Sequence, residues 1–160
     1  MVESLKSVNI VLGRVDDKLL HGRVGVIWEK HCKATVILVV DDEIFLDIAQ
    51  QTSISKLVQP YGTKIIYWSF QQTLLSINLL SNERILLIVK NPIIMNELVQ
   101  AGLPIKKVNL GNMHRSIRKK KLANDYIFVD NRDIEAIKAM KDKGVVITAN
   151  ILPTENEVIL

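Results

Sequence analysis

About seven short apolar runs, separated by longer amphipathic segments, constrain the fold of this chain more than any other feature. The run from Thr35 to Asp41 is almost entirely apolar and rich in β-branched residues, which is typical of a strand covered on both faces. Aromatic residues make up only 5% of the chain, so Ile, Val and Leu must fill the core. The runs cover residues 8–15, 35–41, 63–68, 84–90, 106–111, 125–130 and 145–149.

Helical periodicity fills most of the gaps between these runs. Pro92 suits the first turn of a helix, and Gly144 suits a helix C-cap. Strands that alternate with helices form βαβ units, so the sequence predicts an α/β fold. We expect a single open, mainly parallel sheet of about seven strands with helices on both faces. The predicted helices cover residues 20–30, 44–58, 70–80, 92–101 and 133–143, and the second stops before Pro60 and Gly62.

The length of 160 residues suits one ordinary domain, which we place at residues 1–160. The single cysteine, Cys32, excludes an internal disulfide framework and a Cys-rich zinc site. No apolar stretch approaches the ~20 residues that a membrane-spanning helix needs. The first residues, Met1–Lys6, lack the layout of a signal peptide. We therefore expect a soluble cytoplasmic protein without a membrane span of its own.

The formal net charge is +4, and positive residues gather in one segment. Arg115, Arg118 and Lys119–Lys121 form this basic cluster. We favour a solvated loop or helix face; the alternative is a surface that docks an acidic protein or faces a membrane partner. Aromatic residues do not interleave with it, so we expect no nucleic acid partner.

The segment after the first predicted strand holds an unusual density of functional groups. From Gly13 to Gly22 the chain reads Gly-Arg-Val-Asp-Asp-Lys-Leu-Leu-His-Gly. In open α/β sheets, ligands bind where loops leave the carboxyl ends of the strands. A helix that begins near His21 would add free backbone N–H groups to the positive charges of Arg14 and Lys18. That combination favours a phosphate.

His21 offers the chemistry that such a site could use. A neutral imidazole is a nucleophile, and a carboxylate from Asp16 or Asp17 could hold its second nitrogen and fix the ring orientation. Phosphoryl transfer requires little beyond positioning and charge stabilisation. A histidine that caps a helix, surrounded by ordinary surface ion pairs, explains the same residues equally well.

The segment Arg14-Val-Asp-Asp-Lys-Leu-Leu-His-Gly-Arg-Val24 resembles the active-site loop of a known family. The family comprises the IIB components of the mannose/fructose/sorbose type in the bacterial sugar phosphotransferase system, whose loop typically reads R-[IV]-D-D-R-L-[IL]-H-G-Q-V. The resemblance continues in order through nearly the whole chain. It includes Trp28, Val39–Glu43, Pro60 with Gly62, Val108–His114, Gly144–Val145 and Pro153.

The resemblance implies a transferase that works as a phosphohistidine carrier. His21 would accept a phosphoryl group from a phosphohistidine of the IIA protein and pass it to a sugar bound by the membrane components IIC and IID. It implies no metal and no organic cofactor, because the donor arrives already phosphorylated. The carrier would be cytoplasmic and peripherally associated with the transporter. The family's sugars are mannose, fructose, sorbose and amino sugars such as N-acetylgalactosamine.

The resemblance also implies roles for the neighbours of His21. Arg14 and Lys18 would hold the phosphoryl group, and Asp16 would associate with the histidine. Lys18 replaces the family's usual arginine, which keeps the charge but loses the planar bidentate fork. Arg23 replaces the usual glutamine, and our hypothesis is that it takes over the second phosphate contact. The complete supporting set is Arg14, Asp16, Asp17, Lys18, Gly22 and Arg23.

Other polar residues allow two interpretations each. Asp41 and Asp42 end a predicted central strand and could chelate Mg²⁺ in a metal-dependent phosphatase or a receiver-like domain. We favour N-capping of the next helix. Asn109 and Gly111 fit a turn that approaches the phosphate loop closely, and equally a simple strand-end turn. His114 follows a predicted strand end, so it could line the same cleft.

Overall fold

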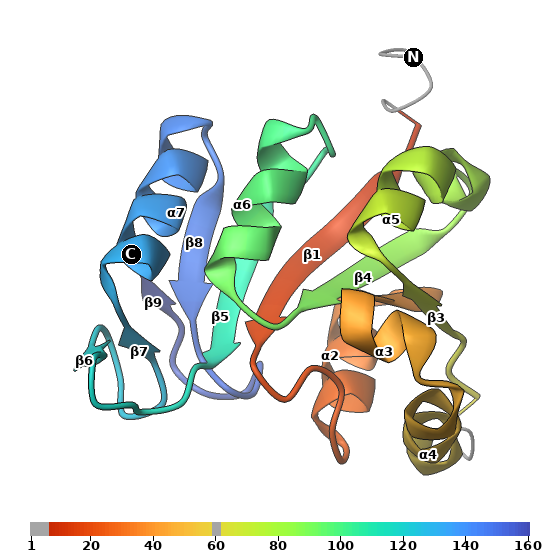
Figure 1. The fold of residues 1–160 in the computed structure, drawn as a ribbon, viewed down its shortest axis with the longest axis horizontal. Helices are drawn as coiled ribbons and strands as arrows, with labels where there is room; N and C mark the ends of the chain where they lie inside the picture. The colour runs from red at the N-terminus through yellow and green to blue at the C-terminus, as the bar shows by residue number, and fades with distance from the viewer. Residues whose placement is uncertain (1–6, 59–61) are drawn as a thin grey trace.

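The computed structural model describes residues 7–58 and 62–160. Two expectations fall outside these ranges, namely the lack of a signal peptide in Met1–Lys6 and the helix stop before Pro60. Figure 1 shows a twisted open sheet with helices packed against it. Among the described residues, no helix is both long enough and apolar enough to cross a membrane.

Within the described residues, the main sheet has seven strands, and its pairings are parallel apart from the last. The strands are β1 (Asn9–Asp16), β2 (Val36–Val40), β3 (Ile65–Trp68), β4 (Arg84–Val89), β5 (Lys107–Asn112), β8 (Val146–Ala149) and β9 (Val158–Ile159). Their order is β3-β2-β4-β1-β5-β8-β9, and only β9 runs antiparallel to its neighbour. The predicted mainly parallel sheet is therefore confirmed.

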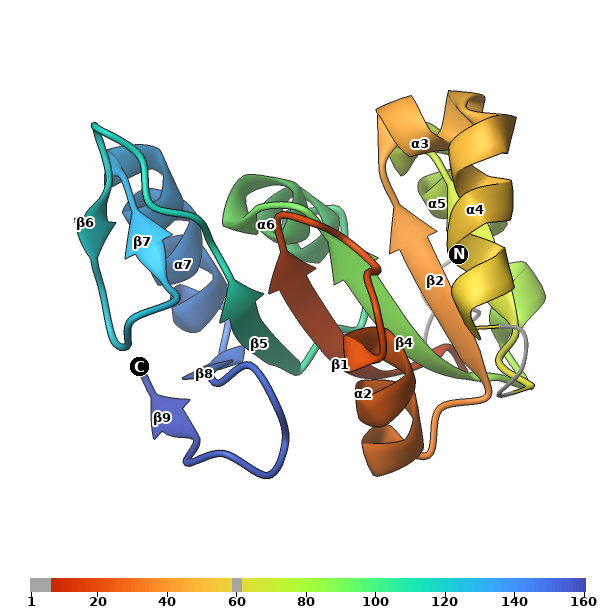
Figure 2. The same cartoon turned by 90° about the horizontal axis from the view of Figure 1, so that it is seen from below.

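Helices cover both faces of this sheet, as predicted. They are α2 (Val24–Cys32), α3 (Asp42–Leu46), α4 (Ile48–Val58), α5 (Phe70–Ser76), α6 (Pro92–Gln100) and α7 (Asn131–Asp142), with a 3₁₀ helix at Ile77–Leu80. All of β2 is buried, and its side chains alternate between two cores. Leu38 faces the core shared with α5, α6 and α7, whereas Ile37 and Val39 face the core shared with α2, α3 and α4. Figure 2 shows α6 and α7 on one side of the sheet and α2 on the other.

Three predicted elements differ from the structure in continuity, helix type or sheet membership. The helix predicted at 44–58 is split into α3 and α4 at Asp47, whose carboxylate accepts a hydrogen bond from the backbone N–H of Gln50. This contact caps the second helix and interrupts the first. The helix predicted at 70–80 ends in a 3₁₀ turn. The strand predicted at 125–130 is only β7 (Phe128–Val129), which pairs with β6 (Lys120–Lys121) outside the main sheet.

Candidate functional site

The loop that carries His21 is built on Asp16, the last residue of β1. The Asp16 carboxylate accepts the backbone N–H of Lys18 at 3.0 Å, and the Asp16 carbonyl accepts that of Leu19 at 2.8 Å. Leu19 and Gly22 both adopt left-handed backbone conformations, with φ of 56° and 53°. Such residues interrupt a right-handed helix. They explain why α2 begins at Val24 instead of residue 20, and why His21 lies in the loop before it.

His21 is oriented by the carboxylate of Asp16. Its Nε2 lies 3.0 Å from Oδ2 of Asp16. An ionised carboxylate can only accept hydrogen bonds, so Nε2 carries the proton and Nδ1 keeps its lone pair. Asp16 is completely buried, whereas the His21 side chain is 36% exposed. The loop therefore presents to the solvent an imidazole whose orientation is fixed by Asp16.

Arg14 lies beneath this loop, with only 1% of its surface exposed. Its guanidinium donates to the Asn109 side-chain oxygen at 2.6 Å and to the Asn150 carbonyl at 3.4 Å. It also donates to Oδ2 of Asp16 at 3.4 Å. Burial lowers the pKa of Arg14 and the Asp16 carboxylate opposes that shift. Each charge compensates the other in the interior, so Arg14 acts on His21 through Asp16.

The aromatic ring of Trp28 and the missing side chain of Gly111 leave the space that the Arg14 guanidinium occupies. Cζ of Arg14 lies 5.1 Å from the centroid of the Trp28 ring, within the range of a cation–π contact. Trp28 is held in turn by a hydrogen bond of 2.7 Å from its Nε1 to the Ile151 carbonyl. A Cβ atom at Gly111 would lie 2.1 Å from Cζ of Arg14. A residue larger than glycine at position 111 would therefore displace the arginine.

The turn predicted at Asn109 and Gly111 is wrong, because both residues lie within β5. Asn109 is the partner of Arg14 in the parallel pairing of β1 with β5, and its side chain is buried against that arginine. The predicted close approach does occur at Gly111. The approaching group is the side chain of Arg14, the first residue of the segment that resembles the active-site loop.

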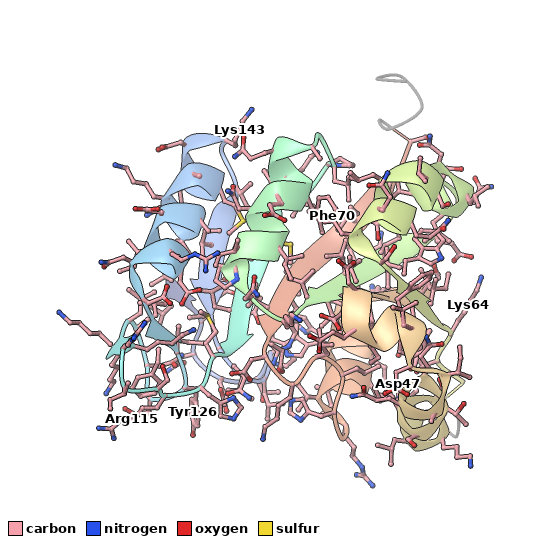
Figure 3. All side chains as sticks on the ribbon, viewed as in Figure 1. Asp47, Lys64, Phe70, Arg115, Tyr126 and Lys143 are labelled. Carbon is pink, nitrogen blue, oxygen red and sulfur yellow. The ribbon has the colours of Figure 1, made fainter. Side chains whose placement is uncertain are left out.

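A pocket of about 540 Å³ opens beside His21. It lies at the carboxyl ends of β1 and β5, the edge of an open α/β sheet where ligands bind. Figure 3 labels Arg115 and Tyr126, two residues of its wall, at the lower edge of the molecule. Its walls combine positive, acidic and aromatic side chains. The lining residues are Asp16, Lys18, His21, Asn112, Met113, His114, Arg115, Asp125, Tyr126, Phe128 and Ile151.

The predicted phosphate-binding cations take different positions relative to this pocket. Lys18 is exposed and lines it. Arg14 is buried behind Asp16 and is absent from its wall. Arg23 is exposed at the N-cap of α2, outside the set of lining residues. The structure therefore brings Lys18 and His21 together at one surface and separates Arg14 from it.

Asp17 contacts a second histidine instead of His21. Its carboxylate accepts the backbone N–H of His114 at 2.6 Å and contacts Nδ1 of the same ring. Of the two aspartates that the sequence offered for orienting His21, the geometry therefore selects Asp16. His114 lines the pocket together with His21, as its position after a strand end suggested.

The acidic residues after β2 serve the fold. Asp41 accepts the backbone N–H of Ile44 at 3.0 Å and so caps α3. It also lies 2.9 Å from Nζ of Lys90, and this hydrogen bond raises the pKa of that lysine. Asp42 accepts the backbone N–H of Phe70 at 2.9 Å. The helix-capping interpretation is therefore confirmed. Within the described residues, no cluster of three or more His, Cys, Asp or Glu side chains is arranged to hold a metal ion.

Comparison with known proteins decides the family. A family model described as "PTS system sorbose subfamily IIB component" matches residues 10–159. The chain belongs to this family of phosphotransferase system components. The resemblance seen in the loop around His21 is thus confirmed, and the match to the family model extends over almost the entire length of the IIB component.

Individual relatives match this IIB component over similar lengths. The N-acetylgalactosamine-specific phosphotransferase enzyme IIB component 2 of Escherichia coli K12 is 36% identical over 148 residues, covering 92% of this chain and 93% of the relative. The fructose-specific EIIB component of Bacillus subtilis is 32% identical, covering 92% and 91%.

Solved structures of IIB components share the fold. The N-acetylgalactosamine-specific IIB component 1 of Escherichia coli matches with a TM-score of 0.88 at 33% identity, over 93% of this chain and 97% of that one. The IIB domain of the sorbose permease from Klebsiella pneumoniae matches with a TM-score of 0.86 at 26% identity, over 94% and 92%. The α/β fold is therefore that of the family.

Sequence reasoning missed the contribution of Asn150 to the site. Its carbonyl accepts from Arg14, and its side-chain oxygen accepts from the amide of Asn109. The available signal was a polar residue directly after the buried strand β8. Such residues lie at the same edge of the sheet as the loop after β1, so Asn150 belonged among the candidates.

Proposed function

We propose that this IIB component is a phosphohistidine carrier in sugar uptake. His21 accepts a phosphoryl group from a phosphohistidine of a IIA protein and transfers it to a sugar held by the membrane components IIC and IID. The observation that carries this proposal is the hydrogen bond from Nε2 of His21 to the buried Asp16, which leaves Nδ1 as the nucleophile at the pocket.

The geometry supports a simple sequence of bond changes. The lone pair on Nδ1 of His21 attacks the phosphorus atom, and the P–N bond of the donor breaks with its electron pair returning to the donor's imidazole. Positive charge develops on the His21 ring during this step. The Asp16 carboxylate stabilises that charge through Nε2–H, and it is already in place before the reaction begins.

We assign different roles to the cations around His21. Lys18 faces the pocket and supplies positive charge to the phosphoryl oxygens. Arg14 is buried and its donors are engaged by Asn109, Asn150 and Asp16, so we assign it to positioning the carboxylate. The hypothesis that Arg23 makes a second phosphate contact stays a prediction. Phosphorylation rates of Lys18→Ala and Arg23→Ala test it, and an unimpaired Arg23→Ala removes it.

The names of relatives support the partners in this proposal. The mannose-specific EIIAB component of Escherichia coli is 31% identical over 148 residues, and this chain covers 45% of it. Its name joins a IIA and a IIB component. We propose that the present chain receives its phosphoryl group from a IIA protein in the cytoplasm, needs no metal or organic cofactor, and associates peripherally with the transporter.

N-acetylgalactosamine is the first sugar to test. Two Escherichia coli relatives named for this sugar are 36% and 32% identical to the chain, and two of the similar solved structures are named for the same sugar. Other relatives are named for mannose, fructose and sorbose, so a panel of these four sugars covers the alternatives.

Mass spectrometry after incubation with phosphorylated IIA protein tests the carrier step. We expect a mass gain of one phosphoryl group, located on His21 by peptide mapping under non-acidic conditions. His21→Ala is expected to show no gain. His31→Ala is the matched control, because His31 lies on the surface of α2 and has a ring contact with Trp28. A phosphoryl group on another residue, or normal charging of His21→Ala, contradicts the proposal.

A further inference from the structure

Two consecutive carboxylates each hold an imidazole at the pocket. Asp16 contacts Nε2 of His21, and Asp17 contacts Nδ1 of His114. The carrier step uses only the first pair. The second pair is reinforced by the backbone N–H of His114, which also donates to Asp17, so two contacts join segments 97 residues apart in the sequence. The second imidazole is therefore fixed in the wall of the same pocket.

The contact with Asp17 determines what His114 can do. Nδ1 donates to the carboxylate, so Nε2 of the neutral ring keeps its lone pair. The side chain is 53% exposed, which leaves the ring accessible from the pocket. An imidazole that is oriented by a carboxylate and has a free second nitrogen is the arrangement of a general base.

Transfer to a sugar creates a need for such a base. The hydroxyl oxygen of the sugar attacks the phosphorus atom of phosphorylated His21, and the P–N bond breaks with its electron pair returning to Nδ1. The hydroxyl proton must then leave. His21 cannot take it while the new P–O bond forms, because Nε2 already carries a proton toward Asp16 and Nδ1 is still bonded to the phosphorus atom. Charging from another histidine releases no such proton.

The other groups at the pocket are less suited to the task. Lys18 and Arg115 are cations, and the exposed Asp125 forms an ion pair with Lys121. Besides Asp17, the titratable and charged groups that line the pocket with His114 are Asp16, Lys18, His21, Arg115, Asp125 and Tyr126.

We propose that Nε2 of His114 accepts the proton of the sugar hydroxyl when phosphorylated His21 discharges. The inference rests on the proposed carrier function and concerns only its second half. Asp17 stabilises the imidazolium that forms, as Asp16 does for His21 in the first half. The base then returns its proton to water when the sugar phosphate leaves.

The test measures the two half-reactions separately. His114→Gln and the wild type are charged with phosphorylated IIA protein, and then mixed with vesicles containing IIC and IID and one of N-acetylgalactosamine, mannose, fructose or sorbose. We expect unchanged charging and a discharge about 100-fold slower. Added imidazole should partly restore discharge in His114→Ala. His31→Gln serves as the control.

Each outcome separates this inference from the carrier function. Normal discharge by His114→Gln overturns the inference and leaves the carrier function intact. Equal slowing of both half-reactions, without rescue by imidazole, also overturns it, because His114 then serves only to hold the loop through Asp17. If the wild-type protein becomes phosphorylated but transfers its phosphoryl group to none of the four sugars, both the sugar-transfer step and the inference are wrong. A wild type that does not charge removes the carrier function itself.

Discussion

At the scale of single residues, one buried ion pair fixes the orientation of a loop histidine. Asp16 has no exposed surface, and taking its charge out of water is costly unless a partner compensates it. Arg14 provides that compensation from below, while His21 contacts the same oxygen from the pocket side. Arg14 therefore holds the Asp16 carboxylate in place, and the carboxylate in turn orients the partly exposed imidazole of His21.

Replacement of Asp16 by asparagine should remove the carboxylate that links Arg14 to His21. The Asp16→Asn variant leaves the Arg14 charge buried without its partner, so we expect a loss of about 3 kcal/mol in the free energy of unfolding. The His21 ring should also lose its preference for the Nε2–H tautomer, which ¹⁵N NMR of the imidazole detects. Asp17→Asn is the control and should leave the His21 signals in place. An unchanged His21 spectrum in Asp16→Asn would refute the orienting role.

Gly111 tests the packing of Arg14. Because a Cβ atom there would lie 2.1 Å from Cζ of Arg14, Gly111→Ala should lower the free energy of unfolding by about 2 kcal/mol and slow phosphorylation of His21. Gly13→Ala is the matched control on β1. Its Cβ atom would meet the flexible end of Met95 at 2.9 Å, so we expect a smaller loss of stability and normal phosphorylation. Chemical denaturation compares the two, and equal effects would count against the packing argument.

At the scale of elements, α7 shows how local hydrogen bonds define a helix start. The Asp130 carboxylate accepts the backbone N–H of Asp133, and the Asp133 carboxylate accepts that of Asp130. These contacts satisfy two backbone N–H groups at the helix start, and the helix begins two residues before the predicted start at Asp133. Asp133 also forms an ion pair with Lys119 of the basic cluster at 3.0 Å.

The cap predicts a defined pH dependence. The hydrogen bond from the Asp133 backbone lowers the pKa of Asp130 in the folded chain. The contribution of the ionised Asp130 carboxylate to stability is therefore fully present above the pKa of an aspartate in the unfolded chain. It is lost as the pH falls through the lowered pKa of Asp130 in the folded chain. Asp130→Ala should cost about 1 kcal/mol at neutral pH, and the difference from the wild type should shrink in acid. Urea unfolding measured across pH checks this, and a difference independent of pH would be inconsistent with it.

The same scale shows what the sequence could and could not predict. Long β-branched runs such as Val36–Val40 identify buried strands, because such residues pack well on a sheet covered on both faces. The strand β9 (Val158–Ile159) was missed, since two residues give no periodic signal and only the exposed edge of β8 determines where they pair. The break at Asp47 was missed because the apolar pattern continues across it.

The site, too, contains features that the sequence predicted and features that it did not. The loop around His21 was identified because its functional groups are adjacent in the sequence. The roles of Arg14 and Gly111 could not be predicted, since burial of the arginine depends on how β1 pairs with β5. A cation next to a histidine looks the same in the sequence whether it faces a phosphate or supports a carboxylate.

At the scale of the whole molecule, the C-terminal segment helps to hold the site. The hydrogen bond from Trp28 to the Ile151 carbonyl joins α2 to a residue 123 positions away. Trp28→Phe removes this bond but keeps an aromatic face for Arg14, so we expect a loss of about 1 kcal/mol. Trp28→Leu also removes the cation–π contact and should cost more. Denaturant unfolding ranks the three proteins, and equal losses in both variants would exclude a contribution from the ring face.

The hydrogen bonds of Arg14 also determine how late in synthesis the loop around His21 can acquire its support. Its partners Asn109 and Asn150 follow it by 95 and 136 residues in the chain. During synthesis, the ribosome therefore releases the histidine motif long before the residues that immobilise its arginine exist. Until Asn150 has left the ribosome, the nascent chain can display the motif only without the two hydrogen bonds that hold Arg14 in the folded protein.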